Sequence, residues 1–267
     1  MPGPDQYNIF MIIDRQAGAP GRIIIFIALI AVAACGPKPS ETDRFKQHLA
    51  EAKLAMSESK YPAAIKSFRK ALQIHENDAE VHFDIAGCFE KIGLADSAIL
   101  YYEGSIIFNP NNILAYEKIG DIYYKRQDWH EARSWYDRGM ELGRLKPSSN
   151  LALGNIHYRW REWVKARDYF LTAARGDSSN AEAHLGLGLS RLSLGDTTLA
   201  IADLEKAVEL ASFSKAMFYL GMAEFNRNRF ADSERWLTMY LDREPLGEFG
   251  NRAKEYLRII AIKKRSE

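Results

Sequence analysis

Two carboxylates and six histidines are the residues of this chain whose types could support acid–base or metal chemistry. Glu117 and Asp121 are four residues apart, so on a helix they would lie one turn apart on the same face, in reach of one sugar ring. A solvated, charged helix face explains the same pair more simply. The histidines are scattered, and no His-Glu-x-x-His motif accompanies them. We therefore expect a protein that is not an enzyme and that needs no metal or cofactor.

Other motifs that would indicate catalysis or nucleotide binding are weak. Gly186-x-Gly188 lacks the third glycine of a dinucleotide loop and lies in a helical pattern instead of after a strand. Trp129 and Trp163 recur at equivalent places in the chain, which favours packing over ligand stacking. Trp160, between two arginines, is the one tryptophan that we predict as a surface contact.

Cys35 has the strongest chemical signal in the chain. An apolar run occupies residues 23–34, too short for the roughly 20 residues that span a bilayer, and it ends in small residues as a secretory signal peptide does. The order Val32-Ala33-Ala34-Cys35 resembles the bacterial lipobox, in which the cysteine thiol accepts diacylglycerol. We expect residues 1–34 to be a removed lipoprotein signal peptide and residues 35–44 a lipidated tether.

The alternative for this segment is an ordinary signal peptide, or a short anchor, that happens to end in cysteine. Arg22 lies unusually far from Met1, and a start at Met11 would give a conventional signal, so both start codons remain open. The residue after the cysteine is Gly36 and not the aspartate of an inner-membrane retention signal. By resemblance this favours the periplasmic face of the outer membrane.

Composition limits the remaining possibilities. The chain has 267 residues, 47% of them hydrophobic, and 36 basic against 35 acidic side chains, so it can bury a core and has no basic excess to attract nucleic acid. Two cysteines cannot build a Cys₄ zinc site. If Cys35 carries lipid, Cys88 has no partner in the chain, and its apolar helical surroundings predict a small buried residue.

A repeat of 34 residues organises the rest of the sequence. Small residues recur with the large apolar residue four positions later, as in Ala132 with Tyr136 and Ala166 with Phe170. Another small residue precedes each such alanine by twelve positions, as Gly120 and Gly154 do. Each unit contains two apolar stretches of helical period, for example Ala79–Ile92 and Asp96–Phe108. These registers predict helical hairpins that stack into one array.

This pattern resembles the tetratricopeptide repeat, through segments such as Gly-Asp-Ile-Tyr-Tyr at 120–124 and Trp-His-Glu-Ala at 129–132. The resemblance implies an all-α, right-handed superhelical solenoid, with about six helix-turn-helix repeats over residues 45–248. Tyr240 departs from the pattern at a position that is normally small. We expect residues 249–267 to form a capping helix over Phe249–Ile262 and a polar tail. Ser40 to Asp43 looks like the capping box of the first helix.

The resemblance also predicts where a partner binds, because in such arrays the first helix of each unit lines a concave groove. The middle of that groove would be polar and aromatic, and its C-terminal third apolar. The predicted groove residues are Glu117, Asp121, Tyr124, Asn155, Tyr158, Arg159, Leu185, Leu189, Leu192, Met222 and Phe225. We expect Leu189 and Leu192 to stay exposed, while packing of the apolar third under the capping helix is the alternative. An amphipathic helix or an extended peptide would fit this surface.

The function that these expectations favour is a lipid-anchored scaffold of the bacterial envelope, which holds other envelope proteins in the groove. The layout resembles the pilus-assembly lipoproteins that help an outer-membrane secretin to multimerise, and also lipoproteins of β-barrel assembly and of polysaccharide export. Acidic Glu117 and Asp121 would repel the carboxylate that chaperone-binding repeats grip. The alternative function is an enzyme accessory that binds glycan or peptidoglycan through Tyr124, Tyr158 and Trp160.

Overall fold

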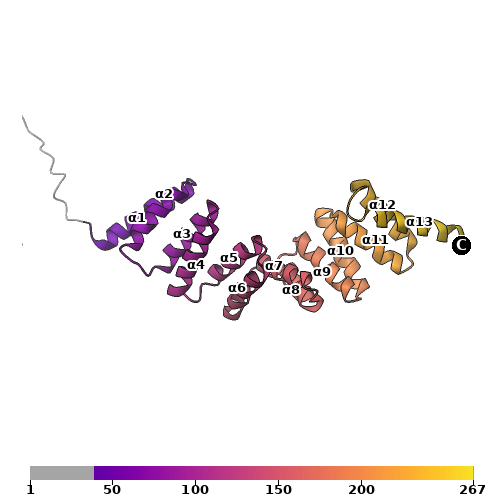
Figure 1. The fold of residues 1–267 in the computed structure, drawn as a ribbon, viewed down its shortest axis with the longest axis horizontal. Helices are drawn as coiled ribbons and strands as arrows, with labels where there is room; N and C mark the ends of the chain where they lie inside the picture. The colour runs from indigo at the N-terminus through magenta and orange to yellow at the C-terminus, as the bar shows by residue number, and fades with distance from the viewer. Residues whose placement is uncertain (1–38, 267) are drawn as a thin grey trace, which may run out of the picture. The chain divides into compact units, whose positions relative to one another are not determined.

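The computed structural model describes residues 39–266 of the chain. The predicted signal peptide and Cys35 lie outside the described residues. Within residues 39–266 there are thirteen helices and no strand (Figure 1). They are α1 (Glu41–Ser57), α2 (Tyr61–Leu72), α3 (Ala79–Lys91), α4 (Ala95–Phe108), α5 (Ile113–Lys125), α6 (Trp129–Leu142), α7 (Pro147–Arg159), α8 (Trp163–Gly176), α9 (Ala181–Ser193), α10 (Thr197–Ala211), α11 (Ser214–Asn226), α12 (Phe230–Arg243) and α13 (Gly250–Ser266).

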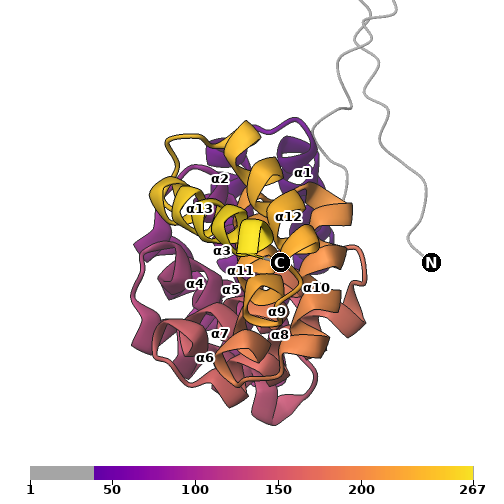
Figure 2. The same cartoon turned by 90° about the vertical axis from the view of Figure 1, so that its right-hand side faces the viewer.

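Successive helices pair into six hairpins, and this confirms the predicted all-α solenoid. Each odd-numbered helix from α1 to α11 makes its most extensive contacts with the helix that follows it. The second helix of most hairpins then packs against the first helix of the next, as α2 does on α3 and α10 on α11. Viewed from one end, the first helices of the hairpins from α3 to α11 lie toward the middle and most of the second helices toward the outside (Figure 2).

In the last four hairpins a glycine of the first helix packs directly against the large residue of the second helix. A methyl group built on Gly120 would lie 2.6 Å from the Tyr136 ring, and one on Gly154 would lie 2.6 Å from Phe170. Gly188 and Gly221 meet leucines in the same way, at 2.7 Å and 2.6 Å. The glycines are therefore required by the close approach of the two helices, which confirms the packing predicted from the spacing.

The turn inside every hairpin contains one residue in the left-handed region. These residues occupy one register of the repeat: Ser59, Gly93, Gln127, Arg161, Gly195 and Asn228, with φ between 58° and 85°. The backbone N–H of each turn residue donates to a carbonyl in the last turn of the preceding helix, as Gln127 does to Tyr124 at 3.0 Å. This left-handed residue is what ends the first helix and turns the chain back toward the second.

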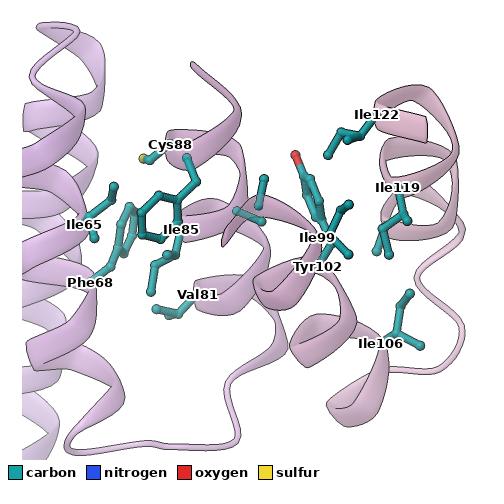
Figure 3. Packing of buried hydrophobic residues seen from close by; sticks show 14 of the residues in the cluster. Ile65, Phe68, Val81, Ile85, Cys88, Ile99, Tyr102, Ile106, Ile119 and Ile122 are labelled. Atoms are coloured by element: carbon teal, nitrogen blue, oxygen red, sulfur yellow. The ribbon is translucent and has the colours of Figure 1, made fainter. Parts of the chain in front are cut away.

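The core of the first three hairpins is continuous (Figure 3). Phe68, Ile85 and Tyr102 are fully or almost fully buried and come from α2, α3 and α4. Cys88 is buried in the same cluster as a free thiol, and burial raises its pKa to about 11. The predicted role of Cys88 as a small core residue is thus confirmed.

The last helix, α13, covers the end of the array and packs on α12 and α11. Tyr240, the residue that departs from the repeat pattern, accepts a hydrogen bond of 2.9 Å from the backbone N–H of Phe249, which fixes the start of this helix. The helix continues to Ser266, beyond the predicted end of the capping helix at Ile262. α1 begins at Glu41, directly after Ser40 of the predicted capping box, so residues 41–44 of the predicted tether are helical.

Candidate partner-binding groove

The predicted groove residues lie on α5, α7, α9 and α11, in a few registers of the repeat. One register contains Tyr124, Tyr158 and Leu192, and another contains Asp121, Asn155 and Leu189. Along both registers the side chains change from polar to apolar toward the C-terminus. A partner lying along this surface, called the groove below, would therefore meet a polar end and an apolar end.

The polar end is organised by Glu90 of α3, a residue that the sequence analysis did not select. Its carboxylate accepts hydrogen bonds from the Tyr102 hydroxyl at 3.1 Å and from the ammonium groups of Lys118 and Lys125 at 3.4 Å and 3.3 Å. Burial alone would raise the pKa of Glu90, but Lys118, Lys125 and Tyr102 together hold it below the ordinary value. Glu90 occupies the register of Tyr124 one repeat earlier, and this register could have identified Glu90 as a groove residue from the sequence.

Asp121 belongs to the same polar end. It accepts a 2.7 Å hydrogen bond from the Tyr136 hydroxyl, and burial raises the pKa of its carboxyl group above the ordinary value. Asp121 is half-buried, and its place in the groove stays a prediction. Its hydrogen bond to Tyr136 joins α5 to α6.

Glu117 does not line the groove, and its prediction as a partner-binding residue was wrong. It is 2% exposed, and its Oε1 accepts hydrogen bonds from the backbone N–H of Lys146 at 2.6 Å and from the Ser149 hydroxyl at 2.8 Å. These bonds join α5 to the start of α7, where the contact between α6 and α7 is less extensive than at the other hairpin junctions. The carboxylate therefore stabilises the junction of the third and fourth hairpins.

Tyr124, Asn155 and Arg159 form the middle of the groove, and the structure brings them together. The Asn155 amide donates to the Tyr124 hydroxyl at 3.0 Å, across neighbouring repeats. The Tyr124 ring packs edge-on against Trp129, and the Arg159 guanidinium lies over the same indole, 4.8 Å from its centroid. Trp129, the first residue of α6, thus packs against two of the predicted groove residues. The sequence predicted a packing role for this tryptophan.

The same arrangement recurs one repeat later with a more apolar result. Tyr158 packs edge-on against Trp163 at 4.9 Å, and Phe225 packs on Phe230 at 5.7 Å. In each case a groove residue in the last turn of the first helix rests on the first residue of the second helix. The groove side chains are therefore held in place before any partner arrives, which lowers the entropy cost of binding.

The apolar end of the groove combines partly exposed and covered side chains. Tyr158, Leu185, Leu192 and Phe225 are half-buried around the core cluster of α9 to α13. Leu189, which was expected to stay exposed, is only 6% exposed, because this cluster extends from α9 through α13. That expectation was wrong for Leu189, and Leu192, also expected to stay exposed, is half-buried.

The capping helix covers part of this end, as the alternative to an open groove required. Phe225 lies 4.8 Å from the Tyr256 ring of α13, and Phe218 stacks on Phe249 at 4.4 Å. Met222, between them in sequence, is half-buried. Tyr256 of α13 and Phe249 therefore cover part of the α11 surface at this end.

Trp160 is half-buried, and its role as a surface contact stays a prediction. Its indole stacks on His130 at 4.8 Å, lies under the Arg133 guanidinium at 5.2 Å, and packs edge-on against His157. It therefore joins α6 to the end of α7. Tyr124 and Tyr158 are each tied to their own tryptophans, so the three aromatic residues that were considered for glycan binding do not form one platform.

The described residues also hold the two carboxylates and the histidines in structural bonds. Glu117 and Asp121 each accept intramolecular hydrogen bonds instead of facing a shared pocket. The ring Nε2 of His82 donates to the Glu76 carbonyl at 3.1 Å, and that of His184 donates to Ser178 at 3.3 Å, in the same register of two repeats. Within residues 39–266 no three histidine, cysteine or acidic side chains are grouped to hold a metal ion, and no helix has the length and apolar character to span a bilayer.

Family models for the tetratricopeptide repeat match residues 49–113, 115–148, 151–215 and 187–248. Among curated proteins, the chain is 30% identical over 139 residues to small glutamine-rich tetratricopeptide repeat-containing protein 2 of Mycosarcoma maydis, a stretch that spans 51% of this chain and 40% of that protein. The chain therefore spans less than half the length of this curated relative.

Solved structures agree with the fold. YrrB, described as a tetratricopeptide repeat protein with an unusual peptide-binding site, aligns with a TM-score of 0.66 at 18% identity over 72% of this chain and all of that one. The pilF protein of Pseudomonas aeruginosa aligns with a TM-score of 0.61 at 13% identity over 80% of this chain and 98% of that one. At these identities the likeness concerns the fold.

Proposed function

Because the chain belongs to the tetratricopeptide repeat family, whose members mediate protein–protein interactions, we propose that it is a lipid-anchored scaffold of a bacterial cell envelope. Its groove on α5, α7, α9 and α11 holds a segment of another envelope protein during assembly of an envelope complex. The array has the role of a preformed docking surface and not of a catalyst.

The observation that carries the docking role is the half-exposed apolar row at the C-terminal end of the groove. Leu192 and Tyr158 lie there, in a register that is polar or charged at Glu90. An amphipathic helix or an extended peptide would place apolar side chains on this row and polar ones along Tyr124 and Asn155. The contacts with Trp129 and Trp163 keep the groove tyrosines in one orientation, so these side chains lose little further entropy when a partner binds.

The envelope part of the proposal rests on the sequence before the described residues. The lipobox-like order ending at Cys35 supports lipidation, and Gly36 supports the outer membrane by resemblance. A pilus system, with its outer-membrane secretin, is the complex that we propose first, because a lipobox followed by six repeats resembles the pilus-assembly lipoproteins. The pilF protein shares the repeat fold with this chain, and the likeness extends to the fold alone.

Photo-cross-linking tests the docking role directly. A photoreactive residue at position 192, in the groove, should capture a discrete envelope protein in cells. The same residue at position 199, an exposed leucine at the start of α10 in the same repeat, is the matched control and should not capture it. Equal capture at both positions would overturn the groove as the docking site.

Palmitate labelling with and without globomycin tests the anchor separately. The protein should label at Cys35, and globomycin should make the unprocessed precursor accumulate. A Cys35→Ser protein that is exported and sedimented with membranes as before would remove the anchor from the proposal. Normal piliation and normal secretin multimers in a deletion strain would exclude the pilus system as the complex.

A further inference from the structure

The outer surface of α4 is apolar where the same surface of every other hairpin is polar or small. Leu100 is 65% exposed and Ile107 is 71% exposed, two turns apart on one face of the helix. The residues in the register of Ile107 in the other hairpins are Gln73, Glu141, Arg175, Glu209 and Asp242. Those in the register of Leu100 are Lys66, Ser134, Asp168, Ala202 and Arg235. The other five hairpins thus serve as the comparison, and α4 alone has large aliphatic side chains in both of these registers.

This apolar face lies beside a basic one. The second helix of the preceding hairpin, α2, exposes Lys66, Arg69 and Lys70 and contains no acidic residue. The Arg69 side chain donates to the Tyr101 hydroxyl of α4 at 3.2 Å and so bridges the two helices. Lys66 forms no ion pair within residues 39–266, and Lys70 has a charge interaction with Glu51. Glu103, half-buried between Leu100 and Ile107, offsets one of these three positive charges.

We propose that this basic-apolar face of α2 and α4 lies against an anionic lipid surface, with Leu100 and Ile107 entering the headgroup region. Two exposed aliphatic side chains are far too few for a second copy or another protein, since each partner in a stable complex buries roughly 800 Å². A lipid surface has no such requirement, because apolar insertion and basic charge add to an anchor that already holds the protein.

The position of the face in the chain agrees with this partner. The inference rests on the lipid anchor of the proposed function, and only five residues separate Cys35 from the start of α1. Fully extended they reach about 17 Å, so the first two hairpins are the part of the array that the anchor holds nearest to the bilayer. The face belongs to those two hairpins.

Lysine acetylation read by mass spectrometry tests the inference on the full-length protein. It is reconstituted on phosphatidylcholine vesicles with and without phosphatidylglycerol, and each lysine is compared with itself in the absence of vesicles. We expect Lys66 and Lys70 to react about three- to tenfold more slowly on the anionic vesicles. Lys206, in the register of Lys70 three hairpins from α4, and Lys53, on the first helix of the first hairpin, should keep their rates.

Two variants make the test specific. Leu100→Glu with Ile107→Glu should abolish the protection of Lys66 and Lys70, while Ser134→Glu, which adds a charge in the register of Leu100, should not. Equal rates at Lys70 and Lys206 on anionic vesicles would overturn the inference. Protection that needs no vesicles and grows with protein concentration would assign the face to a second copy instead. Leu192→Glu should leave the labelling unchanged, so loss of groove binding and loss of lipid contact are distinguishable.

Discussion

Gly154 shows at the scale of one residue why the repeat tolerates so little change at its small positions. We predict that Gly154→Ala destabilises the array by about 1–3 kcal/mol, because the added methyl group would overlap the Phe170 ring. Urea unfolding followed by circular dichroism measures the difference.

Gly87→Ala is the matched control for this substitution. Gly87 is also inside a helix, but a methyl group there would lie 3.9 Å from its nearest neighbour, the Tyr102 hydroxyl. We expect this variant to be as stable as the original or up to about 1 kcal/mol more stable, since alanine favours helix over glycine. Equal destabilisation by both substitutions would contradict the packing account.

Glu90 gives a second prediction at this scale, and it concerns pH. Its pKa is held below the ordinary value in the folded state, so its stabilising effect is present above the unfolded-state pKa and is lost as pH falls through the folded one. Glu90→Gln should therefore cost about 1 kcal/mol at pH 7 and almost nothing near pH 3. Unfolding of both proteins at the two pH values tests this. A cost that does not depend on pH would mean that the charge on Glu90 is not what stabilises the site.

At the scale of the element, the left-handed turn residues are the positions where a substitution should most clearly raise the free energy of unfolding. Four of the six are not glycine, and a side chain in this region costs about 1 kcal/mol. Gln127→Gly should therefore raise the free energy of unfolding by roughly that amount. Lys91→Gly, in the last turn of α3, is the control and should lower it by about 0.5–1 kcal/mol. A loss of stability in the Gln127 variant would contradict the assignment of the turn.

The helices themselves were largely predictable, because the same pattern of small and large residues recurs in all six hairpins. The stretches Ala79–Ile92 and Asp96–Phe108 were expected from periodicity, and α3 and α4 match them within one residue. The left-handed turns were only partly predictable. Glycine indicates them at Gly93 and Gly195, whereas Gln127 and Arg161 give no such indication. Polar side chains adopt that conformation here because the helices on both sides require it.

The exposure of groove residues was the part that the sequence could not supply. Glu117 and Asp121 have the same type and lie one helical turn apart, but only Glu117 meets donors from the next hairpin, Lys146 and Ser149. Leu189 and Leu192 are equally apolar, and Leu189 alone is covered by the cluster that continues into α13. These outcomes depend on the neighbouring repeat, which periodicity within one repeat does not describe.

At the scale of the whole molecule, the charge pattern predicts how binding responds to salt. The chain carries a net charge of +1, and the lysines at the polar end of the groove are already paired with Glu90. Partner affinity should therefore change less than about threefold between low and high salt, since few charges are left to form long-range attraction. Titrations at several sodium chloride concentrations test this. A tenfold loss in high salt would show that charge, and not the apolar row, dominates recognition.

The most direct test of the proposed docking site is to measure how tightly purified variants bind the partner that cross-linking identifies. Leu192→Glu places a charge on the apolar row of the groove, and Leu199→Glu places the same charge on an exposed leucine of the same repeat at the start of α10. The account predicts that Leu192→Glu weakens binding at least about tenfold with an unchanged melting temperature, while Leu199→Glu binds normally. Normal binding by a folded Leu192→Glu protein would contradict it.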